Sequence, residues 1–82
     1  MTIHKLKTWP EYFEAIITGR KNFDVRKNDR NFQVGDRLDL LEWNPETGEY
    51  TGRFCNREIT YILNCNRNPF IKVRGYVILS LK

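Results

Sequence analysis

The residues best suited to chemistry lie on one predicted strand, residues 22–26, and at its two ends. Side chains on an extended strand alternate between two faces, so Asp24 and Arg26 should share one face and place an acid beside a guanidinium. Phe23 and Val25 should enter the core from the other face. More cations crowd the ends of this strand: Arg20, Lys21, Lys27 and Arg30. The segment is therefore predicted to form a positively charged ledge with one embedded carboxylate.

A helix should position this ledge from its N-terminal side. Residues 8–11, Thr-Trp-Pro-Glu, match the capping-box pattern, in which a hydroxyl accepts from a helical N–H, a proline begins the helix and a glutamate reaches back. Gly19 supplies the left-handed residue that ends such a helix. One apolar face is predicted from the helical spacing of Trp9, Phe13, Ile16 and Ile17. The chain should then run directly into the strand that carries the ledge.

Alternating apolar residues predict strands along the rest of the chain. Phe32 and Val34 should point inward before a tight turn at residues 35–36, and residues 44–49 should form a hairpin turn. Residues 64–69 are predicted to be a polar loop. The predicted strands are residues 2–7, residues 22–26, a strand through Leu38, Leu40 and Trp43, a strand beginning at Tyr50, residues 57–63, and residues 75–81, the last buried on both faces.

The predicted fold is a single α+β domain, mostly β, over residues 1–82. A chain of this length supports one modest core and no second domain. Short strands of this number, with one early helix, are too few to make two packed sheets of useful size. Closure of the sheet into a barrel would remove the unpaired strand edges. We therefore expect a small β-barrel of five to six strands with the helix packed against it.

Composition and charge narrow the classes of protein and partner. The chain carries a formal charge of +4 and a pI near 9.3, which favours anionic partners. It has no run of 18 apolar residues and no apolar secretory segment, so we expect a cytoplasmic protein with no membrane partner. Cys55 and Cys65 are too far apart for a Cys-x-x-Cys motif and His4 is the one histidine, so no metal and no cofactor are expected. Two reduced thiols are expected, and a cross-strand disulfide is the alternative.

Residues 19–26, Gly-Arg-Lys-Asn-Phe-Asp-Val-Arg, resemble the G-x-K-x-x-[ED]-x-R signature of the ASCH domains. These domains belong to the PUA-like superfamily of small β-barrels. The helix before the glycine, the similarity of residues 32–36 to the family's F-x-V-G-D element and the final hydrophobic strand agree with this likeness. The likeness covers nearly the whole chain and is closest to a short bacterial and phage subgroup with a similar start at residues 4–7 and a similar run at residues 26–30. The resemblance therefore implies a PUA-like barrel.

The resemblance also implies a cleft beside the first helix that is suspected in the family of binding RNA or nucleotides. Arg26 can bind a phosphate or a base edge, Lys21 can act as a point charge, and Asp24 can hold Arg26 or accept from a base amino group. A simpler interpretation is that Asp24 and Arg26 form a partly exposed ion pair worth about 0–1 kcal/mol. The candidate nucleic-acid-binding residues are Lys7, Arg20, Lys21, Asp24, Arg26, Lys27 and Arg30. Trp9 and Trp43 are the stacking candidates, Tyr12 and Tyr50 could also stack on bases, and each of these rings could instead fill the core.

The function predicted for this chain is that of a binding module for RNA or another nucleic acid, and two other functions are alternatives to it. Some ASCH proteins deacylate acetylated cytidine with a lysine, a threonine and a glutamate, which would make Lys21 and Asp24 the catalytic candidates here. The chain has Asp24 at the place of the threonine, and the insertion that bears the glutamate is missing between residues 63 and 70. The resemblance therefore favours binding, with hydrolysis of an acylated nucleoside such as N4-acetylcytidine as one alternative. A protein-interaction module is the other.

The sequence leaves several points open. His4 is either a base near the cleft or a surface residue on the first strand. RNA is not distinguished from DNA or from a nucleoside, and the oligomeric state is unknown. Further cations either extend the basic surface toward the C-terminus or are scattered solvated charges: Arg53, Arg57, Arg67, Lys72 and Arg74.

Overall fold

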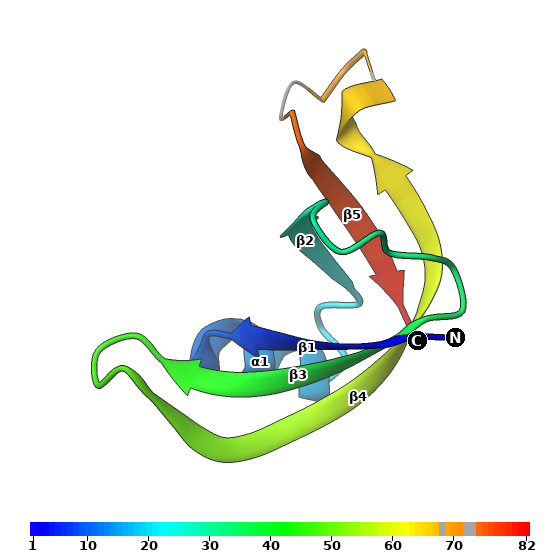
Figure 1. Cartoon of the computed structure of the whole chain (residues 1–82). Coiled ribbons are helices and arrows are strands. Elements are labelled where there is room, and N and C mark those ends of the chain that lie inside the picture. Colours follow the sequence, from blue (N-terminus) through cyan, green and yellow to red (C-terminus); the bar gives the residue numbers. More distant parts are fainter. Residues whose placement is uncertain (68, 72–73) are drawn as a thin grey trace.

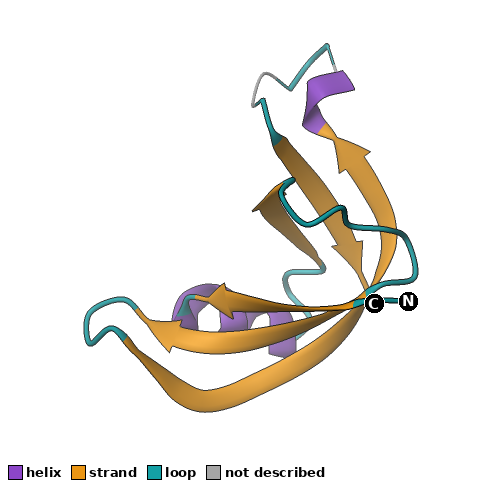
Figure 2. Cartoon of the chain, in the orientation of Figure 1, coloured by secondary structure: helices purple, strands orange, loops and turns teal. Residues whose placement is uncertain are grey.

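Five strands, one α-helix and one 3₁₀-helix form the fold in the part of the chain that the structure describes (Figure 1). The structure is a computed structural model, and the described residues are 1–67, 69–71 and 74–82. Strands outnumber helices, so the predicted α+β, mostly β class is confirmed (Figure 2). In chain order the elements are β1 (Ile3–Thr8), α1 (Pro10–Ile17), β2 (Phe23–Lys27), β3 (Arg37–Asn44), β4 (Glu49–Asn64), η1 (Cys65–Arg67) and β5 (Tyr76–Leu81).

The strands form one sheet in the order β1-β3-β4-β5-β2. β1 pairs with β3 in parallel, and the other neighbouring pairs are antiparallel. β4 is 16 residues long and belongs to both halves of the sheet: residues 49–58 pair with β3, and residues 59–64 pair with β5. Figure 1 shows β4 bending from a lower arm, with β1 and β3, into an upper arm, with β5 and β2. Among the described strands β1 and β2 are not paired with each other, so the sheet is not closed into a barrel.

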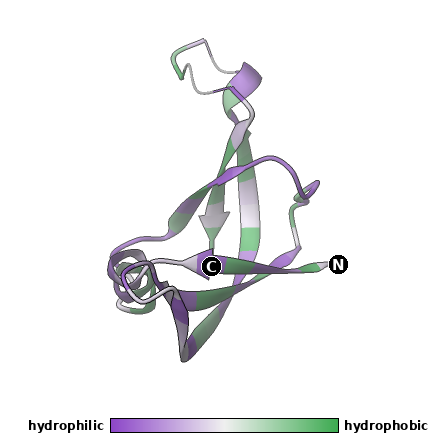
Figure 3. Cartoon of the chain, turned by 60° about the vertical axis from the view of Figure 1, so that its left-hand side comes forward, coloured by the Kyte–Doolittle hydropathy of each residue, from purple (hydrophilic) through white to green (hydrophobic). Residues whose placement is uncertain are grey.

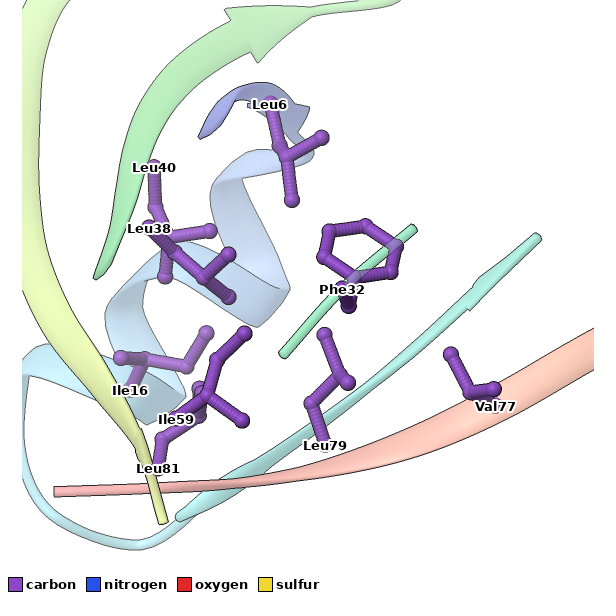
Figure 4. Packing of buried hydrophobic residues seen from close by; sticks show 9 residues of the cluster. All are labelled: Leu6, Ile16, Phe32, Leu38, Leu40, Ile59, Val77, Leu79 and Leu81. Carbon is purple, nitrogen blue, oxygen red and sulfur yellow. The ribbon is translucent and has the colours of Figure 1, made fainter. Parts of the chain in front are cut away.

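A single hydrophobic core joins the two arms. Figure 4 shows side chains from both arms, from α1 and from the loop before β3 pointing toward one another. Burying an aliphatic side chain completely stabilises the fold by about 1.5–3 kcal/mol relative to leaving it exposed, so this cluster is the main stabilising feature. Its members are Leu6, Ile16, Phe32, Leu38, Leu40, Ile59, Val77, Leu79 and Leu81.

The ends of α1 agree with the sequence in part. The helix begins at Pro10, and Gly19 follows its end with a left-handed φ of +80°, as predicted. The capping-box prediction is wrong, because Trp9 is the N-cap residue and no side chain caps the helix. Thr8 is instead the buried last residue of β1, so its hydroxyl serves a different partner.

The predicted apolar face of α1 is narrower than expected. Phe13 and Ile16 are buried, whereas Trp9 and Ile17 remain exposed. A helix of only eight residues presents one narrow stripe to the sheet. The exposed Trp9 is therefore available for contacts outside the core. Figure 3 shows hydrophobic and hydrophilic residues alternating along the strands.

The predicted orientation of β2 is wrong. Asp24 is 7% exposed and faces inward, whereas Phe23 and Val25 are 46% and 48% exposed. Asp24 pairs in register with Leu79, which is fully buried on β5. The face of β2 that carries Asp24 is therefore on the same, buried side of the sheet as Leu79. The acid tolerates burial because its oxygens are hydrogen-bonded, as described below. Asp24 and Arg26 do share one face, as predicted.

The segment before β3 is a loop rather than an inward-facing extended stretch. Phe32 is buried in the core, but Val34 is exposed, so the predicted alternation is wrong. The backbone N–H of Gln33 donates to Asp36 Oδ2 at 3.1 Å, which bends the chain locally. Gly35 then adopts a φ of +94°, and β3 starts directly after this turn, as predicted.

The β3–β4 hairpin is confirmed, and the strands predicted after it merge. Gly48 has a φ of +70° and its N–H donates to the carbonyl oxygen of Asn44 at 2.8 Å. The strands predicted from Tyr50 and over residues 57–63 are one continuous β4. A register shift between Ile59 and Tyr61 leaves Ile59 buried and Tyr61 exposed, although simple alternation would place them on one face.

The C-terminal part of the chain also departs from prediction. The predicted polar loop at residues 64–69 contains η1, whose Cys65 is buried; residue 68 lies outside the described residues, as does Lys72. β5 alternates between the buried Val77, Leu79 and Leu81 on one face and the exposed Tyr76 and partly buried Ile78 and Ser80 on the other, so burial on both faces is wrong. A sheet with one covered face produces this alternation.

The cysteines lie on different elements, and both are free. Burial raises the pKa of the Cys55 thiol. No described helix is long and apolar enough to cross a membrane. The described residues also contain no group of three or more histidine, cysteine, aspartate or glutamate side chains placed to hold a metal ion.

Candidate binding cleft beside Asp24

Asp24 sits at the centre of a small network between α1 and β2. Its Oδ2 accepts a hydrogen bond from Arg26 Nε at 2.8 Å. Its Oδ1 accepts from Lys21 Nζ and from the backbone N–H of Val25, each at 3.2 Å. Charge-assisted hydrogen bonds of this kind are shorter and stronger than neutral ones. Two cations are therefore held on one buried carboxylate.

Local chain geometry explains why these three side chains meet. Asp24 and Arg26 are two residues apart on β2, so they share a face. Lys21 precedes the strand and follows the turn at Gly19, which brings it back against the start of β2. Its Nζ also donates to the carbonyl oxygen of Phe23 at 2.9 Å. The turn after α1 thus supplies one cation and the strand supplies the other.

Arg26 also reaches from β2 to β1. Its Nη2 donates to the carbonyl oxygen of Lys7 at 2.8 Å and to Thr8 Oγ1 at 3.3 Å. The hydroxyl of Thr8 therefore serves Arg26 rather than the helix. Because β1 and β2 are the end strands of the sheet order, Arg26 spans the opening between them with its side chain.

A cavity of about 580 Å³ opens over this network. Its volume lies within the range of about 300–1,000 Å³ that is usual for small-ligand sites. Trp9 and Tyr12 form one wall with their rings 6.4 Å apart and inclined by 23°, both about half exposed. The lining residues are Lys7, Thr8, Trp9, Tyr12, Lys21, Phe23, Asp24, Val25 and Arg26. We call this cavity the Asp24 cleft.

Residues 3–81 match the model of the family described as "Domain of unknown function (DUF3850)". The chain belongs to the DUF3850 family. This DUF3850 chain is also 41% identical, over 58 residues, to the "Uncharacterized 12.9 kDa protein in GpA 3'region" of Escherichia phage P2. That alignment covers 71% of this chain and 51% of the phage protein, so the chain spans about half the length of this relative.

The DUF3850 match includes every residue that lines the Asp24 cleft. The structure brings together six of the residues that the sequence nominated: Lys7, Trp9, Tyr12, Lys21, Asp24 and Arg26. The cleft therefore combines cations, one acid and aromatic rings in a single concave site.

Other nominated residues of the DUF3850 chain lie outside the described lining of the cleft. Arg20 Nε donates to Thr18 Oγ1 at 3.2 Å, and Lys27 is exposed at the end of β2. Arg30 lies in the following loop, with its Nε 3.9 Å from Asp29 Oδ1. Their charges contribute to the positive potential around the cleft rather than to its floor.

Trp43 is also outside the lining of the cleft. Lys7 Nζ lies 4.6 Å from the centre of the Trp43 ring, a distance that permits a cation–π interaction. Trp43 therefore contacts a cleft residue from outside and has no place on the cleft wall. Of the two nominated tryptophans, Trp9 has the position from which a base could be stacked.

The sequence missed the cleft residues Thr8, Phe23 and Val25. Thr8 had been predicted to cap the helix, and the other two had been predicted to fill the core. Lys21 Nζ lies 4.9 Å from the centre of the Phe23 ring and 5.6 Å from that of Tyr12. These aromatic contacts of Lys21 depend on its position between α1 and β2. The sequence alone does not give that position, so it did not indicate the aromatic residues of the cleft.

His4 of this DUF3850 chain is neither at the cleft nor on the surface. It is buried, with Nε2 at 2.8 Å from Asp36 Oδ2 and its ring centre 4.7 Å from that of Phe32. The pKa of Asp36 lies below its usual value, chiefly because of the hydrogen bond with His4 and then because the backbone N–H of Thr2 donates to it. The pair ties the start of β1 to the loop before β3.

Proposed function

We propose that this chain is a nucleic-acid-binding module, most of all for RNA, that holds its ligand in the Asp24 cleft. The observation that supports this best is the pair of cations, Lys21 and Arg26, held on one carboxylate beneath an aromatic wall. Cations recognise phosphate, and aromatic rings accept bases of any sequence. A nucleotide unit has both a phosphate for the cations and a base for the aromatic wall, so it is the ligand that fits this cleft best.

The charge of the cleft supports an anionic ligand. Three lining residues are cationic, Lys7, Lys21 and Arg26, and one, Asp24, is anionic, which leaves two positive charges in excess. The whole chain, cleft residues included, carries a net charge of +4. This balance raises the local concentration of a polyanion and speeds its association.

Arg26 keeps part of its hydrogen-bonding capacity for a ligand. Its Nε donates to Asp24 and its Nη2 to β1, whereas its Nη1 has no partner among the described residues. Two N–H donors on Nη1 are therefore available to phosphate oxygens or to a base edge. Asp24 holds the guanidinium in place for this contact.

The same features support a distant relationship to the ASCH domains. We propose that the bent sheet is an open form of a PUA-like barrel, in which the side chain of Arg26 spans the opening between β1 and β2. The cleft beside α1 would then be equivalent to the cleft of that family. The signature residues of the resemblance, Lys21, Asp24 and Arg26, all contact one another through Asp24.

A hydrolase acting on N4-acetylcytidine has less support. Asp24 Oδ1 accepts two hydrogen bonds and Oδ2 accepts one, which leaves about one of its four lone-pair sites open, and Lys21 Nζ already donates to Asp24 and to the carbonyl oxygen of Phe23. A nucleophile or a general base needs a free lone pair within reach of the substrate. The network is better suited to holding cations for binding.

The experiment is a titration of labelled single-stranded RNA at several salt concentrations. If the three cleft cations each contact a phosphate, the logarithm of the association constant should fall with the logarithm of salt concentration with a slope of about −2. Binding that is undetectable, or that does not change with salt, would refute the proposal. Release of cytidine from N4-acetylcytidine, abolished in Lys21→Ala, would support the hydrolase instead.

A further inference from the structure

The outward face of the upper arm carries three strands in defined register. Across β2, β5 and β4, Phe23 lies opposite Ser80, and Ser80 lies opposite Tyr61. Cross-strand partners point to the same side of a sheet. The next rows on this face are Val25, Ile78 and Leu63, followed by Lys27 and Tyr76.

The opposite face of the same arm is the one that packs in the core. It carries Asp24 and Leu79 in one row and Val77 in the next, all buried. The outward rows are not covered to the same extent: Tyr61 is 62% exposed and Tyr76 is 38% exposed. Figure 1 shows the loop between β2 and β3 crossing the upper arm, and this loop delivers Phe32 to the core side. The aromatic residues of the outward face are thus exposed in the described part of the chain, whereas Leu63, Ile78 and Ser80 between them are partly buried.

Aromatic rings and cations occur together on this face. Its aromatic residues are Phe23, Tyr61 and Tyr76, one on each strand. Lys27 lies in the row of Tyr76, and Lys21 Nζ is 4.9 Å from the centre of the Phe23 ring. No residue in the three rows is acidic. This charge pattern favours a polyanion over an acidic or neutral protein surface.

The face is continuous with the Asp24 cleft at one end. Phe23 and Val25 belong to the outward rows and also line the cleft. At the other side of the arm, Tyr61 and Leu63 line a second hollow of about 380 Å³ that also includes Arg67. A ligand that extends from the cleft across the row of Phe23 therefore reaches the exposed ring of Tyr61 first and then Arg67 in the second hollow.

We propose that the outward face of β2, β5 and β4 is a stacking platform that continues the Asp24 cleft and selects single-stranded RNA over duplex RNA. This inference rests on the proposed function. It assigns to Phe23, Tyr61 and Tyr76 one unpaired base each, with Lys27 and Arg67 at the phosphates beside them. Exposed aromatic residues on a sheet bind single strands in this way.

The spacing of the rings is what selects single strands. Phe23 and Tyr61 are on strands that flank β5, so their backbones are about 10 Å apart, twice the usual strand separation. Stacked bases in a duplex follow one another at about 3.4 Å. Bases on the two rings are therefore separated from each other, and a duplex, whose base faces are covered by neighbouring base pairs, offers neither ring a face on which to stack.

The test compares a short and a longer probe. Tyr61→Ala and Tyr76→Ala should each weaken the binding of an oligouridine of about ten nucleotides by about 5- to 150-fold, the loss expected for one stacked base. The affinity for a uridine dinucleotide, which occupies only the cleft, should not change. Tyr61→Phe should bind like the original chain because the ring is retained. The matched control is Tyr50→Ala, since Tyr50 is an exposed tyrosine of β4 in the lower arm.

The outcomes separate this inference from the proposed function. If Lys21→Ala weakens both probes and the tyrosine variants weaken only the longer one, both proposals stand. If Lys21→Ala weakens both probes but the tyrosine variants bind normally, the platform is refuted and the cleft is not. If the original chain binds neither probe, both are refuted, and loss of self-association in Tyr61→Ala would assign the face to a second copy. Should Tyr61→Ala fail to fold, Tyr61→Leu removes the ring while keeping an apolar side chain.

Discussion

Arg26 on β2 donates a hydrogen bond to the carbonyl oxygen of Lys7 on β1 at 2.8 Å, although these strands lie at opposite ends of the sheet order. A side chain thus connects two edges that have no backbone pairing with each other. The same guanidinium is held by Asp24 and faces the cleft. The link between β1 and β2 and the proposed binding of a ligand therefore involve the same residue.

Replacing Arg26 should reduce stability. Arg26→Ala leaves Asp24 with one cationic partner and removes the contact with β1, so the free energy of unfolding should fall by about 1–3 kcal/mol. Arg26→Lys keeps the charge but not the planar fork, so it should recover only part of the loss. Urea unfolding followed by circular dichroism measures both. Arg20→Ala, which loses only an exposed contact with Thr18, should change stability by less than about 0.5 kcal/mol.

Replacing Lys21 should change how RNA binding depends on salt. Lys21→Ala removes one phosphate contact, so the slope of the logarithm of affinity against the logarithm of salt should become shallower by about 0.7–1. Fluorescence anisotropy over about 50 to about 200 mM salt measures the slope. Lys5→Ala is the matched control, because Lys5 is an exposed lysine of β1 outside the cleft lining. Equal slopes for the two variants would contradict a role for Lys21 at phosphate.

Removing the ring of Trp9 should weaken binding without changing this slope. Trp9 is exposed on the cleft wall, so Trp9→Ala should cost about 1–3 kcal/mol of binding free energy if a base stacks there. Trp9→Phe should retain most of the affinity. A loss in Trp9→Ala that is accompanied by a lower melting temperature would indicate a structural role for the ring instead.

Acid should destabilise the fold through Asp36. Its pKa is lowered in the folded state, so its contribution to stability is present above the unfolded pKa of about 4 and is lost as pH falls through the lower folded value. Asp36→Asn should therefore be less stable at neutral pH and should lose less stability below about pH 4 than the original chain. Urea unfolding between neutral and acidic pH measures this. Asp29→Asn, at an exposed loop residue, should leave the pH profile unchanged.

Local patterns in the sequence predict the elements well and their packing less well. Pro10 and Gly19 mark the ends of α1 because their backbone preferences act within one turn. The hairpin at Gly48 follows from the same kind of local constraint. The mostly β class also followed from alternation, whereas closure into a barrel depends on pairing between distant strands.

The orientation of β2 shows why the rest escaped prediction. Alternation divides Phe23, Asp24 and Val25 between two faces, but it does not say which face is buried. Hydrophobicity favours burying Phe23, yet the register with β5 and the hydrogen bonds from Lys21 and Arg26 bury Asp24. Similarly, no local spacing links His4 to Asp36, which lie 32 residues apart in the chain.

The order in which this sheet is built limits when the cleft can exist during synthesis. β2, which carries Asp24 and Arg26, has β5 as its sheet neighbour, and β5 is the last strand of the described chain. A nascent chain that still holds residues 76–81 inside the ribosome therefore cannot hold Asp24 and Arg26 in their final positions. The polypeptide should acquire its affinity for an anionic ligand only after this last strand has emerged and docked.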